Sequence, residues 1–128
     1  MSQTVQILKN KAKVADKVVV AESFLTRARG LLGRKSFEPG FGMLFPNCNN
    51  IHMWFMSVPL DVVFLKKEKN AYRVSSVHEN VQPWKLLPLA DFRASETLEF
   101  PIGTIRANAL REGDVLEFEN RKMSYGSV

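Results

Sequence analysis

The residues of this chain that could do chemistry lie together in one segment, from Cys48 to Met56. This segment contains the single cysteine, one of the two histidines (His52) and one of the two tryptophans (Trp54). In one interpretation His52 takes the proton of Cys48, and the thiolate attacks a carbonyl or phosphoryl centre. Asp61, which follows in the sequence, could orient the imidazole. Cys48, His52 and Asp61 are therefore the candidate catalytic residues of a hydrolase or transferase.

The same segment offers soft metal ligands. The sulfur atoms of Cys48 and Met56 and the imidazole of His52 suit Cu(I) or Zn, with Trp54 packed over a Cu(I) ion by a cation–π contact. A third interpretation is structural, with Cys48 as a small buried hydrophobic residue and His52 as a hydrogen-bonded core residue. We favour this third interpretation because free cysteine is among the most buried residue types. The sequence thus predicts no cofactor and keeps Cu(I) or Zn as an alternative.

Asp61 is a second point of interest because it opens the apolar run 62–65. A buried acid there needs a partner. Arg27 and Arg34 lie on one flank of a predicted helix, and either could pair with Asp61. Alternatively, the two arginines receive an anionic ligand. We favour pairing, because buried charges are usually paired.

His78 and Trp84 are expected near the same place. His78 ends a predicted strand, on which it shares a face with Val74 and Ser76. Hairpin pairing would bring His78 to the Asp61 end of the preceding strand. Trp84 could cover this region, although a lone loop tryptophan more often plugs the end of a fold. The predicted ligand-binding residues are Arg27, Arg34, His52, Trp54, Asp61, His78 and Trp84.

The elements that must position these residues follow from the pattern of apolar and polar positions. Strands are predicted at 5–7, 13–21, 51–56, 61–65, 72–78, 97–100 and 115–119. The strand at 51–56 is apolar on both faces, which predicts a central, fully buried strand. A polar hairpin tip is expected at 66–70, and short helices at 22–33 and 101–110. One mainly-β domain is expected over 1–119, followed by a flexible C-terminal tail at 120–128.

Three groups of motifs occur in order along the chain. They are Arg27-Ala28-Arg29-Gly30-Leu31-Leu32-Gly33-Arg34 with Gly42-Met43-Leu44-Phe45, then Trp54-Phe55-Met56 with Pro59-Leu60-Asp61-Val62-Val63-Phe64-Leu65, and finally Leu98-Glu99-Phe100-Pro101-Ile102-Gly103-Thr104 with Glu112-Gly113-Asp114. Over roughly residues 14–118 the chain resembles the uncharacterised bacterial and archaeal family called domain of unknown function 192. The lead-in Cys48-Asn49-x-Ile51-His52 looks like one branch of that family. The resemblance implies a single-domain β-sandwich resembling a jelly roll, and it brings no established activity, substrate or cofactor.

Length and composition are those of an ordinary soluble globular protein. The chain has 128 residues, of which 45% are hydrophobic and 24% charged. No apolar run approaches the ~20 residues of a membrane span, and no secretory signal is recognisable. The single cysteine cannot form an internal disulfide, so we expect a cytoplasmic location. The net charge of +5 is scattered, so no specific nucleic-acid partner is expected.

The sequence predicts first a small monomeric binding module, whose partner is a small molecule or a protein. Its end pocket would be lined by His52, Trp54, His78 and Trp84 and rimmed by Asp61 and arginines. The alternatives are an enzyme that depends on Cys48 and His52, and an accessory domain that meets a partner protein through a loop or a sheet edge.

Overall fold

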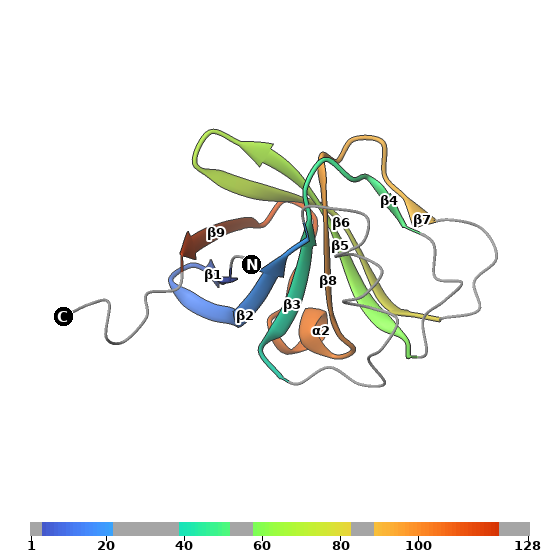
Figure 1. Cartoon of the computed structure of the whole chain (residues 1–128), viewed down its shortest axis with the longest axis horizontal. Coiled ribbons are helices and arrows are strands. Elements are labelled where there is room, and N and C mark those ends of the chain that lie inside the picture. Colours follow the sequence, from blue (N-terminus) through green and yellow to red (C-terminus); the bar gives the residue numbers. More distant parts are fainter. Residues whose placement is uncertain (1–3, 22–38, 52–57, 83–88, 121–128) are drawn as a thin grey trace.

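Seven strands close into one β-barrel in the computed structural model, which describes residues 4–21, 39–51, 58–82 and 89–120 (Figure 1). The barrel strands are β1 (Thr4–Lys9), β2 (Ala12–Val20), β3 (Phe41–Phe45), β5 (Leu60–Glu68), β6 (Ala71–Val81), β8 (Glu96–Pro101) and β9 (Val115–Asn120). Around the barrel they follow the order β1-β2-β3-β8-β5-β6-β9. The prediction of a mainly-β fold is therefore confirmed.

Closure of the barrel depends on β9, which pairs with β1 on one side and with β6 on the other. The neighbouring strands are antiparallel except for β2 and β3, which are parallel. The predicted jelly-roll sandwich is wrong in this respect. Alternating apolar and polar positions look the same in a sandwich and in a barrel, and only the pairing of the outermost strands distinguishes them.

A separate two-stranded sheet lies beside the barrel, at the upper right of Figure 1. It pairs β4 (Asn50–Ile51) with β7 (Leu89–Ala90). The strand predicted at 51–56 is therefore not central at its described end, where Ile51 pairs only in this small sheet. Residues 52–56 lie outside the described part of the chain.

The helix α2 (Thr104–Ala107) lies at one end of the barrel (Figure 1). It is much shorter than the helix predicted at 101–110, because Pro101 still belongs to β8 and Gly103 adopts a φ of +93°. Such a φ suits glycine and breaks a right-handed helix. The predicted helix at 22–33 lies outside the described residues. No helix in the described ranges is long and apolar enough to cross a membrane.

Two apolar clusters hold the barrel together. The interior cluster draws residues from every barrel strand, including Leu98 and Phe100 of β8, and Ile105 of α2 packs into it. The outer cluster covers the outside of β3, β5 and β6 with residues such as Met43, Val62 and Val81. As a result, most of β5 and β8 is buried on both faces.

Two register shifts in the β5–β6 hairpin decide where its side chains point. Phe64 pairs with Ser76 but the next residue, Leu65, pairs with Val74, so Ser75 is an extra residue in β6. Val74 therefore joins the interior cluster, while His78 lies opposite Val62 of the outer cluster. The prediction that His78 and Val74 share a face is wrong because of this bulge. The turn is also shorter than predicted, since the strands extend to Glu68 and resume at Ala71.

Candidate functional site

One row of residues crosses the outer face of the barrel from β3 to β6. Met43 of β3 pairs with Glu99 of β8, Glu99 pairs with Val62 of β5, and Val62 pairs with His78 of β6. Residues directly opposite in neighbouring strands point to the same side of the sheet. Glu99 and His78 are therefore two strands apart on one face, on the order of 10 Å between backbones.

Glu99 is the most unusual residue of this row. It is 1% exposed, and its Oε1 has no hydrogen-bond partner among the residues that the structure describes. Burial raises the pKa of the Glu99 carboxyl to about 8, because an apolar environment disfavours the charged form. At neutral pH Glu99 is thus largely a neutral acid that can donate a hydrogen bond. Strongly perturbed acids of this kind cluster at functional sites.

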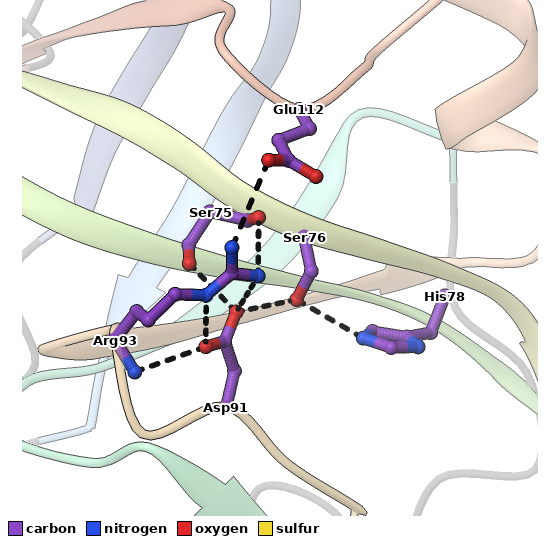
Figure 2. A network of polar contacts seen from close by, with 6 residues as sticks. All are labelled: Ser75, Ser76, His78, Asp91, Arg93 and Glu112. Carbon is purple, nitrogen blue, oxygen red and sulfur yellow. Dashed lines mark hydrogen bonds and ion pairs between the residues drawn. The ribbon is translucent and has the colours of Figure 1, made fainter.

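A polar network adjoins His78, with Asp91 at its centre (Figure 2). The Ser75 and Ser76 hydroxyls donate to Oδ2 of Asp91 over 2.6 and 2.7 Å. The backbone N–H and Nε of Arg93 donate to Oδ1 over 3.0 and 3.2 Å. Both serines reach one oxygen because the bulge at Ser75 turns two consecutive side chains to the same side.

This network fixes the orientation of His78. Partial burial raises the pKa of Asp91, but hydrogen bonds from Ser75, Ser76 and Arg93 outweigh burial and hold the pKa well below its usual range. Because the Ser76 proton points to Asp91, we assign the proton of the 3.1 Å contact between Ser76 Oγ and His78 Nε2 to the imidazole. The His78 ring also meets Phe64 edge to face, with 5.5 Å between centroids.

Cys48 lies at the border of the same outer face. Its backbone N–H donates to the Ser95 carbonyl, and its carbonyl accepts from the Thr97 hydroxyl of β8 over 2.7 Å. The partly buried thiol packs against the outer cluster and donates to the Asn50 carbonyl over 3.0 Å. The structure thus places Cys48 and His78 on one layer. The role of Cys48 as nucleophile or metal ligand stays a prediction.

Asp61 belongs to a different place. It pairs with Phe100 of the interior cluster, so its side chain lies on the face opposite to His78, although both are near one end of β5. The Asp61 carboxylate accepts backbone N–H groups of Asn80, Gly103 and Ile105 over 2.9 to 3.0 Å. These three bonds attach α2 and Asn80, which lies at the second register shift between β5 and β6, to Asp61 of β5. The predicted single neighbourhood for Asp61 and His78 is wrong, because alternation separates them.

The remaining predicted site residues lie outside the described part of the chain. They are Arg27, Arg34, His52, Trp54, Met56 and Trp84. An arginine partner for Asp61 and the metal set of Cys48, His52 and Met56 therefore stay predictions. Within the described ranges, no three His, Cys, Asp or Glu side chains are grouped so that they could hold a metal ion.

Sequence reasoning missed Glu99, Asp91 and Ser76. In the alternating strand at 97–100, a charged residue such as Glu99 normally marks the solvent face. The signal that could have found it is the adjacent apolar strand 62–65, which needs cover on both faces. Nothing in the pattern around Asp91 predicts that two serines of another strand bind it.

These features define a class of protein. It is a small closed β-barrel with a buried acid and an oriented histidine on its outer face. The chain belongs to the family DUF192, described as "Uncharacterized ACR", which matches residues 5–118. It is 30% identical over 108 residues to a UPF0127 protein of Pyrococcus abyssi, covering 80% of this chain and 86% of that protein. It is 29% identical over 106 residues to a UPF0127 protein of Thermococcus kodakarensis, covering 80% of this chain and 64% of that protein. The predicted family membership is confirmed.

Two solved structures share the fold. A crystal structure from Sinorhizobium meliloti, described as a candidate transcription regulator, has a TM-score of 0.74 and 23% identity, with 92% of this chain and 94% of that chain covered. A protein of unknown function from Novosphingobium aromaticivorans has a TM-score of 0.74 and 22% identity, with 91% and 84% covered. At these identities the likeness concerns the fold alone.

Proposed function

We propose that this protein is a small-ligand binding module whose site lies on the outer face of β5, β6 and β8. The observation that carries the proposal is Glu99, a fully buried carboxyl whose pKa is raised to about 8 and whose Oε1 has no partner in the described part of the chain. Leaving such a group without a partner is unfavourable by roughly 1–3 kcal/mol. A ligand that offers a hydrogen-bond acceptor would remove that penalty, so Glu99 is suited to bind one.

The chemistry of the face indicates the kind of ligand. Neutral Glu99 donates, and it stands among apolar neighbours such as Met43 and Val62. His78, on the order of 10 Å away across two strands, supplies a second polar group whose orientation Ser76 and Asp91 fix. The ligand is therefore a small, partly apolar molecule with an acceptor oxygen, such as a carbonyl or carboxylate, at one end.

The proposal keeps His52, Trp54 and Trp84 as predicted members of the site. In sequence, residue 52 follows Ile51 and residue 88 precedes Leu89, and Ile51 pairs with Leu89. Ile51 belongs to the outer cluster, and Leu89 packs against it. The described residues next to these positions in sequence, Ile51 and Leu89, therefore lie on the same layer as Glu99.

Native mass spectrometry of untagged protein, purified under reducing conditions from cells of its natural source, tests this proposal. We expect a non-covalent adduct of small-molecule mass. Glu99→Gln keeps a hydrogen-bond donor and should retain the adduct, while Glu99→Leu should lose it. Glu117→Gln, at an exposed position of β9, is the matched control. A bare mass for the wild-type protein, or an adduct that survives Glu99→Leu, contradicts the proposal.

A further inference from the structure

A cavity of about 410 Å³ opens at the end of the barrel opposite α2. Each of the seven barrel strands contributes a residue to its wall, so we call it the mouth cavity. Val5, Val20, Leu44 and Phe118, from β1, β2, β3 and β9, form the apolar part of its lining, and polar residues form the rest. Its size lies in the range of small-molecule sites, which often occupy barrel mouths.

Glu96 of β8 is the charged residue in the wall of this cavity that lacks a full set of partners. It alternates with Leu98 and Phe100, both in the interior cluster, so its side chain is turned into the barrel. Glu96 is 5% exposed, and its Oε2 has no hydrogen-bond partner among the described residues. A buried carboxylate oxygen in this position requires a donor.

Two other polar residues of the wall, Tyr72 and Lys67, show how the charge of Glu96 is presented. Burial raises the pKa of the Tyr72 hydroxyl, and the negative charge of Glu96 raises it further, so this charge acts across the cavity. The Tyr72 ring packs on Phe118 with 4.4 Å between centroids. Lys67 is exposed at the rim. The cavity thus combines an inner negative charge with an aromatic pair, which are the features that hold an organic cation.

We propose that the mouth cavity binds a small amine with an apolar body, whose ammonium group donates to Glu96. The apolar part fills the space between Val20, Leu44 and Phe118. This site is distinct from the one around Glu99, because residues 96 and 99 of β8 point to opposite faces of the strand. Either site can therefore fail its test without deciding the other.

The test compares hexylammonium with hexanol, two probes of equal chain length that differ in charge. Isothermal titration calorimetry gives both affinities, and NMR shift changes at Tyr72 locate the binding. We expect hexylammonium to bind about tenfold or more tightly than hexanol. Glu96→Gln should remove this preference, and Glu117→Gln, an exposed acid of β9, should leave it unchanged.

A second variant keeps the test decisive if Glu96→Gln does not fold. Lys67→Gln removes an exposed positive charge at the rim, so it should tighten hexylammonium binding by about twofold and leave hexanol unchanged. The proposal is overturned if the two probes bind with equal affinity, or if the preference for the amine survives Glu96→Gln. It is also overturned if Lys67→Gln binds the amine more weakly than wild type, or if no NMR shift changes at Tyr72.

Discussion

Glu99→Gln isolates the energetic effect of one buried proton. Burial raises the pKa of Glu99 from its ordinary value of 4.5 to about 8, so the folded protein holds a proton that the unfolded chain releases. The stability that this proton confers is fully present below pH 4.5 and is lost as pH rises to about 8. At roughly 1.4 kcal/mol per pH unit, the loss is about 5 kcal/mol in total, and about 3 kcal/mol of it has occurred by pH 7. Glutamine has nearly the same shape and does not titrate, so this loss should vanish.

Urea unfolding of both proteins at several pH values between about 5 and 8 measures this effect. The free energy of unfolding of Glu99→Gln minus that of the wild-type protein should increase by roughly 1.4 kcal/mol for each pH unit. Glu117→Gln, at an exposed position, should run parallel to the wild-type curve. A difference between Glu99→Gln and wild type that stays constant over the whole range would refute the reasoning, because it would mean that Glu99 does not carry the proton.

Three further predictions concern the polar contacts around the barrel. Asp61→Ala leaves three backbone N–H groups without their acceptor and should lower the free energy of unfolding by roughly 3–5 kcal/mol, so an unchanged urea midpoint would contradict its structural role. Asp91→Asn should lower stability by roughly 2 kcal/mol at neutral pH. Because the pKa of Asp91 is lowered by folding, the wild-type advantage should be present above about pH 4 and shrink in more acidic urea titrations; a constant advantage would argue against an ionised Asp91. Ser76→Ala removes the acceptor of His78 Nε2, so nitrogen-15 NMR of the imidazole should report an altered tautomer ratio, and an identical spectrum would show that Ser76 does not orient the ring.

The strands could be predicted because their signal is local. Val5 and Ile7 of β1, and the apolar run 62–65 in β5, carry their pattern within a few residues. Closure by β9 could not be predicted, because it depends on which strand its edge meets, and that choice leaves no mark in the alternation. The pattern at 101–110 predicts a longer helix than α2, because Pro101 can equally end a strand or begin a helix.

The candidate site was harder to predict than the strands. Hairpin pairing places His78 near the Asp61 end of β5, as predicted, but a single extra residue, Ser75, changes which residues share its face. Glu99 escaped notice because its environment is made by Met43 and Val62, which are distant in sequence. A carboxyl that is charged in one surrounding and neutral in another has the same letter in the sequence, so only tertiary structure reveals its state.

The pairing of β1 with β9 also has a consequence for how this protein folds. Gln6 and Glu119 hydrogen-bond across these strands although they are 113 residues apart. Closing so long a loop is entropically unfavourable until the intervening strands are in place, and folds dominated by such distant contacts fold slowly. During synthesis β1 must therefore wait for β9, and until then β1 and β6 each expose an unpaired edge. We expect the chain to depend on rapid completion of this last strand, since an open barrel edge is a template for aggregation.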